Sequence, residues 1–247
     1  MVLDNGYIND YLVHWTGKDG LRSGFEALTS ILTKNRLKLG YNPYVWLDFR
    51  TKAVCKMACF TDVPIQHSRI HCKKYGKFGI AFSKRSLANI GAHPVFYYTH
   101  TTQQDVKKVV TFLHSEGGRA IPQDIFTALW RHFHFCQEYG KGKIESRDAA
   151  YYEREWRLGE DYLDEQHGQN GVKYKRLLNG QSRCFGKLVK EGQDLFFEFI
   201  DKDVAFIVLP RRYANKFRKA FKDRHLRVKI YEDIVVPSKG RRHRTRE

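Results

Sequence analysis

The chain is organised around Tyr151-Tyr152-Glu153-Arg154-Glu155-Trp156-Arg157-Leu158, in which two carboxylates stand two residues apart beside a Trp-Arg pair. Side chains of an extended segment alternate between two faces, so Glu153 and Glu155 are expected to point the same way, opposite Arg154 and Trp156. Like charges buried together raise the pKa of one carboxyl, as a catalytic site requires. The alternative is an exposed strand edge whose Glu and Arg side chains pair across the surface.

Outward from this stretch, short strands and helices alternate along the chain. The patterns predict strands at residues 11–16, 54–60, 78–82, 94–98, 195–200, 204–209 and 226–231. They predict helices at residues 25–35, 64–74, 83–90, 104–114, 122–138 and 211–224. We expect an α+β fold with mixed or antiparallel strands and helices on the outside.

The 247 residues contain no visible internal repeat and no Pro/Ser-rich linker. We expect one domain over residues 1–236 and a flexible basic tail over residues 237–247. The weakest stretches, residues 138–143 and 168–180, are interpreted as long loops.

The charge of the chain is strongly positive, with 44 Lys plus Arg against 27 Asp plus Glu, a formal net charge of +17. With 14% aromatic residues and no apolar anchor, this balance favours nucleic acid over a membrane surface as partner, although the charge could serve solubility alone. The chain shows no membrane span and no secretion signal, so we expect it in the cytoplasm. Its five scattered cysteines indicate reduced thiols.

Three short motifs form a candidate constellation for chemistry. They are His14-Trp15-Thr16 at one strand end, Cys59-Phe60-Thr61-Asp62 at another, and the acidic stretch around Glu155. Taken singly, His14 fits a half-buried structural histidine and Phe60 fits the core, so only the combination indicates a site.

The chain resembles the AbiGi family of bacterial abortive-infection proteins over nearly its whole length. The resemblance lies in Val-His-Trp-Thr at residues 13–16, Ala-Cys-Phe-Thr-Asp-Val-Pro-Ile at 58–65 with His67, and Tyr-Gly-Lys-Phe-Gly-Ile-Ala-Phe at 75–82. It continues in Pro-Val-Phe-Tyr at 94–97, in residues 153–157, and in Asp-Val-Ala-Phe-Ile-Val at 203–208.

More distantly, the arrangement of His, aromatic residue and Glu resembles the ADP-ribosyltransferase superfamily, including its DarT-like nucleic-acid modifiers. The resemblance implies that NAD is bound as substrate, with His14 on the adenosine ribose, Thr16 in support and Trp15 in the same segment. It also places Phe60, Thr61 and Ser68 at the cofactor. No Tyr stands where the family stacks on nicotinamide, and His71 and Tyr75 are the substitutes.

The resemblance assigns the chemistry itself to the acidic stretch. Cleavage of the nicotinamide–ribose bond builds positive charge on the sugar, which a nearby carboxylate stabilises most in the transition state. Glu155 is the candidate for that task, and Glu153 would polarise the acceptor or position the ribose, with the two roles exchangeable. Arg157 could contact the pyrophosphate, brace a carboxylate through its planar fork, or form a surface ion pair.

The acceptor is inferred from the basic segment near the C-terminus. Phe217 and Phe221 can anchor one face of a helix whose other face would follow phosphates. Single-stranded nucleic acid, RNA rather than DNA, is favoured because a transferase needs an exposed base or sugar. The cations of this segment are Arg211, Arg212, Lys216, Arg218, Lys219, Lys222 and Arg224.

Three functions follow from these observations. The first is an NAD-dependent ADP-ribosyltransferase of nucleic acid, a toxic effector of phage defence with a neutralising antitoxin protein as partner. The second is a non-enzymatic antitoxin or regulator that binds nucleic acid or a toxin. The third is a metal-independent nuclease that uses His14 and a Glu. No metal is expected, because neither Cys55–Cys72 nor His132–Cys136 has zinc-ligand spacing.

Overall fold

The computed structural model describes residues 9–45, 52–98, 104–105, 108–109, 111–112, 115–122, 125, 129, 135–138, 154–159 and 186–234. The chain divides into two compact units. Unit 1 consists of Met1–Asn35, Asp62–Arg85 and Ile200–Glu247, and unit 2 consists of Arg36–Thr61 and Ser86–Phe199. The predicted limits of the domain and its tail stay a prediction, because residues 235–247 lie outside the described residues.

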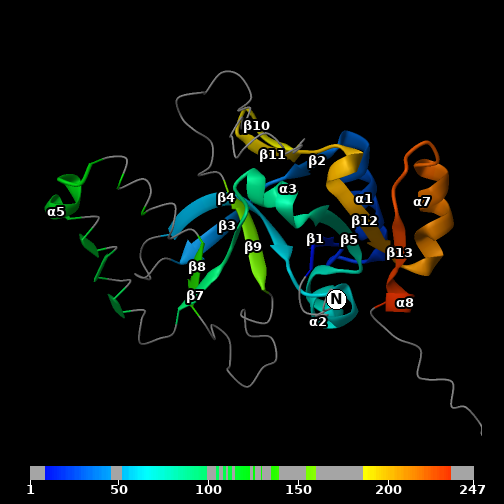
Figure 1. The fold of residues 1–247 in the computed structure, drawn as a ribbon, viewed down its shortest axis with the longest axis horizontal. Helices are drawn as coiled ribbons and strands as arrows, with labels where there is room; N and C mark the ends of the chain where they lie inside the picture. Colours follow the sequence, from blue (N-terminus) through cyan, green and yellow to red (C-terminus); the bar gives the residue numbers. More distant parts are fainter. Residues whose placement is uncertain are drawn as a thin grey trace, which may run out of the picture. The chain divides into compact units, whose positions relative to one another are not determined.

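The described residues of unit 1 form four strands in the order β13-β12-β5-β1 (Figure 1). Their bounds are Tyr11–Thr16 for β1, Phe78–Ser83 for β5, Val204–Leu209 for β12 and Val228–Ile230 for β13. β5 pairs antiparallel with β1 and with β12, whereas β12 and β13 run parallel. The predicted α+β fold with mixed strand pairing is therefore confirmed.

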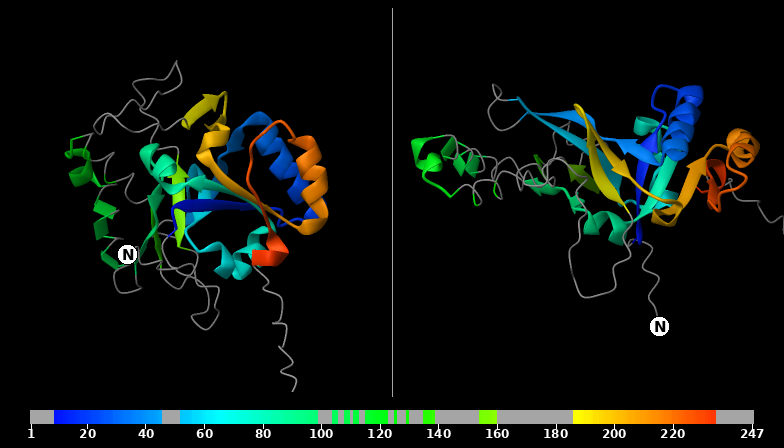
Figure 2. Two further views of the ribbon diagram at one scale, coloured as in Figure 1. Left: turned by 45° about the vertical axis from the view of Figure 1, so that its right-hand side comes forward. Right: turned by 90° about the horizontal axis from the view of Figure 1, so that it is seen from above.

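Helices accompany these strands in unit 1, as Figure 2 shows. The longer ones are α1 (Leu21–Lys34), α2 (Arg69–Tyr75) and α7 (Ala214–Ala220). Single turns are η1 (Ile65–His67), η5 (Asp201–Asp203), η6 (Arg211–Tyr213) and α8 (Tyr231–Ile234). α3 (Lys84–Asn89) follows β5 directly, where the chain passes from unit 1 to unit 2.

Helix α1 is held by the apolar stripe that the sequence predicts. Phe25, Leu28 and Leu32 are buried along one side, at the three- and four-residue spacing of a helix face. Gly24 lies on the same side, where a Cβ atom would stand 2.6 Å from the Phe78 ring. The glycine thus lets the helix approach β5 closely. The helix ends at Asn35, a left-handed C-cap with φ 50°.

Unit 2 contains an antiparallel set in which β4 (Lys52–Thr61) lies between β3 (Gly40–Val45) and β9 (Glu155–Gly159). β6 (His93–Pro94) pairs with the other side of β9. Two smaller groups are β10 (Lys187–Glu191), β11 (Asp194–Glu198) and β2 (Arg36–Lys38) in that order, and the parallel pair β7 (Phe96–Tyr98) and β8 (Cys136–Glu138). α5 (Glu116–Arg119) is a single helical turn.

Cross-strand ion pairs fix the small β10-β11-β2 sheet. Arg36 contacts Glu191 at 2.6 Å and Glu198 at 2.5 Å, and Lys38 contacts Asp194 at 2.7 Å. Burial would raise the pKa of Glu198, but hydrogen bonds from Lys187 and Arg36 outweigh it and lower the pKa. These pairs favour one register of β2 against β11.

Several elements differ from those that the sequence predicts. Residues 136–138, expected to end a helix, form strand β8, because pairing with β7 outweighs helical periodicity. The expected strand at residues 94–98 divides at Val95 into β6 and β7. The basic helix expected over 211–224 begins as a 3-10 turn and ends at Ala220. The interpretation of residues 168–180 as a loop lies outside the described residues.

No helix within the described part of the chain is long and apolar enough to cross a membrane.

Candidate functional site

The acidic stretch forms strand β9, and its central feature is an ion pair between Glu155 and Arg157. Arg157 Nε donates to Glu155 Oε1 at 2.9 Å, and Arg157 Nη2 donates to Oε2 at 3.0 Å. The Arg157 side chain is 3% exposed and that of Glu155 is 11% exposed. Two residues apart on a strand, both side chains share one face. Arg157 therefore braces the carboxylate through its planar fork, one of the roles expected for it, and does so in the interior rather than at the surface.

Neighbouring strands hold Glu155 by its backbone. Its carbonyl accepts the Val95 N–H at 2.8 Å, and its N–H lies 3.5 Å from the Tyr97 hydroxyl. His93 is the register partner of Arg157 on β6. Burial raises the pKa of the nearby Cys136 thiol to about 11, although the charge of Arg157 acts in the opposite direction. The result is a largely buried polar centre formed by a carboxylate and a guanidinium, with the Cys136 thiol close to Arg157.

The expected alternation of Glu153 and Glu155 is not supported by the backbone between them. Arg154 has φ 43°, in the left-handed region, so the extended conformation begins only at Glu155. Strand β9 therefore begins at Glu155, and a shared face for the two carboxylates stays a prediction. Glu153 itself lies outside the described residues.

Phe60 and Thr61 lie beside this centre in unit 2. On β4, Phe60 is the register partner of Trp156 and Thr61 that of Glu155. Both are buried, at 3% and 4% exposure. The structure thus brings Phe60, Thr61, Glu155 and Arg157 together on two paired strands.

Unit 1 contains the remaining residues expected at the cofactor, on β1 and α2. Trp15 packs in a core cluster with Ile65 and Cys72, and Tyr75 lies against that cluster. The indole Nε1 of Trp15 is buried without a hydrogen-bond acceptor among the described residues. Trp15 is thus a core residue, whereas His14 and Thr16 on the same strand are half-buried.

The α2 residues expected at the nicotinamide side are mostly interior. Ser68 is fully buried, and its hydroxyl donates to the Pro64 carbonyl at 3.2 Å. His71 is 4% exposed, with its ring centroid 6.5 Å from that of Tyr75, which is half-buried. His14, Trp15, Thr16, Ser68, His71 and Tyr75 thus belong to unit 1, and Glu155 and Arg157 to unit 2.

The basic segment forms η6 and α7 in unit 1. Phe217 is buried and its ring lies 4.8 Å from that of Phe221, as the sequence predicts for the inner side. Five exposed cations form no ion pair with the residues that the structure describes, and we term them the α7 face: Arg212, Lys216, Arg218, Lys219 and Lys222. Arg211 is also exposed, but it pairs with Asp233.

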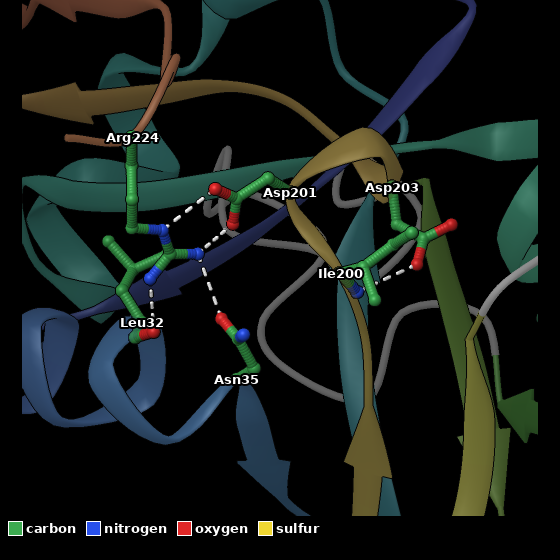
Figure 3. Close-up of polar contacts among 6 residues, drawn as sticks. All are labelled: Leu32, Asn35, Ile200, Asp201, Asp203 and Arg224. Carbon is green, nitrogen blue, oxygen red and sulfur yellow. Dashed lines mark hydrogen bonds and ion pairs between the residues drawn. The ribbon is translucent and has the colours of Figure 1, made fainter.

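Arg224 lies in a polar cluster with Asp201, Asn35 and the Leu32 carbonyl (Figure 3). Its guanidinium pairs with both carboxylate oxygens of Asp201, with Nε 2.8 Å from Oδ2, and donates to the Leu32 carbonyl and to Asn35 Oδ1. These contacts join the C-terminal end of α1 to η5. Arg224 therefore stabilises unit 1, and its predicted contact with phosphate stays a prediction.

Sequence reasoning missed Asp201, which it treated only as part of a turn. The same turn contains Asp203, whose Oδ2 accepts the Ile200 N–H at 3.0 Å. An Asp-Lys-Asp turn between two apolar strands gives a general signal for capping, but nothing local identifies Arg224 as the partner.

Metal ligands were not expected, and no group of three His, Cys, Asp or Glu side chains able to hold a metal occurs within the described ranges. The spacing candidate at His132 and His134 lies outside those ranges.

Comparison with known proteins matches the chain to a protein family. The family described as abortive phage resistance protein AbiGi, antitoxin, matches residues 33–210. The chain is also similar to the abortive phage resistance protein AbiGi of Lactococcus lactis subsp. cremoris, with 22% identity over 213 residues, covering 74% of this chain and 84% of that protein. No solved structure matches the chain.

Proposed function

Because the chain belongs to the AbiGi family of abortive phage resistance proteins, we propose that it serves phage defence as an antitoxin-side regulator that binds nucleic acid through the α7 face. The family description supplies the antitoxin role, which implies a toxin protein as partner. The nucleic-acid role rests on the charge of the chain and on where unit 1 carries it.

The α7 face is the observation that carries this proposal. Its five cations project from one short basic segment, while Ala214 and Phe217 are buried on the inner side. Arg211 and Arg224, by contrast, are paired with Asp233 and Asp201. Cations that form no ion pair with the described residues are available to phosphates, and each phosphate contact releases counterions from the nucleic acid, which is the main source of affinity.

Fluorescence anisotropy with a labelled single-stranded RNA tests the proposal. We compare the wild type with a variant that carries Arg218→Glu, Lys219→Glu and Lys222→Glu. The matched control carries Lys18→Glu, Lys34→Glu and Lys190→Glu, three exposed cations elsewhere, so the net charge changes equally. We expect the α7 variant to lose at least about tenfold in affinity at low salt and the control to stay much nearer the wild type. Equal losses in both variants contradict a site at α7.

A second candidate is ADP-ribosyl transfer to nucleic acid, favoured by the polar centre at Glu155 and Arg157. A carboxylate held in a fork near a half-buried Trp156 and Tyr97 is a preorganised anionic group, able to stabilise positive charge on a ribose. NAD would be the substrate and Glu155 the catalytic group.

Transfer of label from NAD to RNA or single-stranded DNA tests this second candidate. We expect Glu155→Gln to abolish transfer while the wild type labels its acceptor. Circular dichroism of the variant excludes unfolding as the cause. If the wild type binds nucleic acid but transfers no label, the result contradicts the transferase function and supports the regulator. Chain cleavage without NAD would instead indicate the nuclease.

A further inference from the structure

A second cationic surface lies on unit 1, along α2 and the turn after it. We term it the α2 face, and its members are Arg69, Lys73, Lys74 and Lys77, all exposed. The sequence has no acidic residue between Val63 and Arg85. Asp62, just before this segment, is buried and pairs with Lys84 at 2.8 Å. The α2 face therefore has no carboxylate of its own segment to neutralise it.

The helix turns this face outward because its other side is anchored in the core. His71 and Cys72 are buried, and Cys72 packs with Trp15 and Ile65. Arg69 and Lys73 stand four residues apart, so they lie one above the other on a single helix side. Within the described residues, Arg69, Lys73 and Lys77 form no ion pair, which leaves their charges available to an anion.

Aromatic rings lie directly beside these cations. Lys74 Nζ is 5.0 Å from the Tyr75 ring centroid, and Lys77 Nζ is 5.2 Å from that of Tyr231. Tyr231 is buried, but Tyr75 is half-buried and so presents part of its ring. A cationic groove or face with an accessible ring fits single strands, because phosphates meet the cations and an unpaired base stacks on the ring.

The helical turn α8 contains two carboxylates, those of Glu232 and Asp233. Burial and, more weakly, the charge of Glu232 raise the pKa of Tyr231. Glu232 Oε2 accepts the Arg211 N–H at 2.8 Å, and Asp233 pairs with the Arg211 guanidinium. The acidic residues of α8 are thus engaged by η6.

We propose that the α2 face is a second contact surface for single-stranded nucleic acid, in which Arg69, Lys73 and Lys77 hold phosphates and Tyr75 stacks on a base. This inference rests on the proposed nucleic-acid binding and deepens it. The ligand then contacts unit 1 at two separate sets of cations, one on α2 and one on α7.

Salt dependence of binding separates the two surfaces. We measure the affinity for a labelled single-stranded RNA over a series of salt concentrations with the triple variant Arg69→Glu, Lys73→Glu, Lys77→Glu, together with the α7 variant and the Lys18, Lys34, Lys190 control. Each lost phosphate contact on a single strand reduces the slope of log affinity against log salt by roughly 0.7, so three contacts reduce it by about 2. We expect this reduction for the α2 variant and none for the control.

Stacking gives an independent readout at Tyr75. Tyr75→Leu keeps an apolar side chain against the core but removes the aromatic face, so we expect at least about a fivefold loss of affinity with an unchanged salt slope. Unchanged affinity of Tyr75→Leu would contradict the stacking role. Equal affinity of the wild type for duplex and single-stranded RNA would contradict a preference for single strands. Thermal unfolding checks each variant, and Arg69→Gln, Lys73→Gln, Lys77→Gln replaces the charge reversal if that variant does not fold.

The outcomes distinguish this inference from the proposed function. If the α2 variant shows the same salt slope as the control while the α7 variant shows a reduced slope, that result contradicts a contact at the α2 face and still supports the α7 face. Absence of binding by the wild type overturns both.

Discussion

The guanidinium of Arg157 holds both carboxylate oxygens of Glu155, at 2.9 and 3.0 Å, from the same strand and two residues away. Both side chains are almost wholly removed from solvent. A buried pair of this kind stabilises little relative to an apolar pair, but removal of one partner leaves the other charge buried without its counter-charge. The stability of unit 2 therefore depends on both residues together.

Replacement of Glu155 by alanine is expected to lower the free energy of unfolding by about 3–5 kcal/mol, because the Arg157 guanidinium stays buried without that carboxylate. Urea unfolding followed by circular dichroism measures the change. The double variant Glu155→Gln, Arg157→Met is expected to recover part of the loss, since it removes both charges.

The surface pair Arg22–Glu26 provides the control for this prediction. Its side chains are 92% and 63% exposed at a separation of 3.0 Å. Glu26→Ala should cost less than about 0.5 kcal/mol. Similar costs for Glu155→Ala and Glu26→Ala would show that the β9 pair is not buried as described.

Arg224 is expected to matter for stability more than for ligand binding. Arg224→Lys keeps the charge but loses the planar fork that contacts Asp201, Asn35 and the Leu32 carbonyl, so we expect a loss of about 1–3 kcal/mol in unfolding free energy. Lys222→Ala, on the α7 face, should change stability little and weaken RNA binding instead. If Arg224→Lys is instead as stable as the wild type but binds RNA more weakly, Arg224 contacts phosphate rather than stabilising the fold.

Alkaline pH should destabilise unit 1 through Cys72. Burial raises the pKa of this thiol from about 9 to about 12, with a smaller opposing effect of Lys77. The folded state therefore keeps a proton that the unfolded state loses, so the contribution of Cys72 to stability is present below pH 9 and declines as the pH rises toward 12. Urea unfolding at several pH values should show a shallower decline for Cys72→Ala than for the wild type.

Burial also raises the pKa of Tyr11, so Tyr11 likewise lowers stability as the pH rises. This effect is present in both the wild type and Cys72→Ala. Identical pH slopes in the wild type and Cys72→Ala would mean that the thiol is not buried in the folded protein.

Strong local patterns in the sequence predicted much of the fold. The strand predicted at residues 11–16 and the helical spacing of Phe25, Leu28 and Leu32 match β1 and α1. β2, β3 and β10 were not predicted. β3 contains Gly40, Asn42 and Pro43, residues typical of turns, and its extended form depends on pairing with β4.

The sequence indicated which kinds of side chain could interact in the candidate site, but not how the chain arranges them. The sequence indicated that Arg157 could brace a carboxylate, and the bond to Glu155 confirms it. It could not indicate that Arg154 would adopt a left-handed φ, or that Arg224 would meet Asp201 more than 20 residues earlier. Arg224 and Asp201 lie in separate segments of the sequence, and no local spacing indicates their contact.

Photo-crosslinking of the wild type to a labelled single-stranded RNA, followed by mass spectrometry of the peptides, tests the central claim most directly. We predict nucleotide adducts on peptides that contain residues 211–222, where Tyr213 and the cations of the α7 face lie together. We also predict that Arg218→Glu, Lys219→Glu, Lys222→Glu removes these adducts. Adducts confined to peptides of unit 2, or none at all under conditions that crosslink a known RNA-binding protein, would contradict the account.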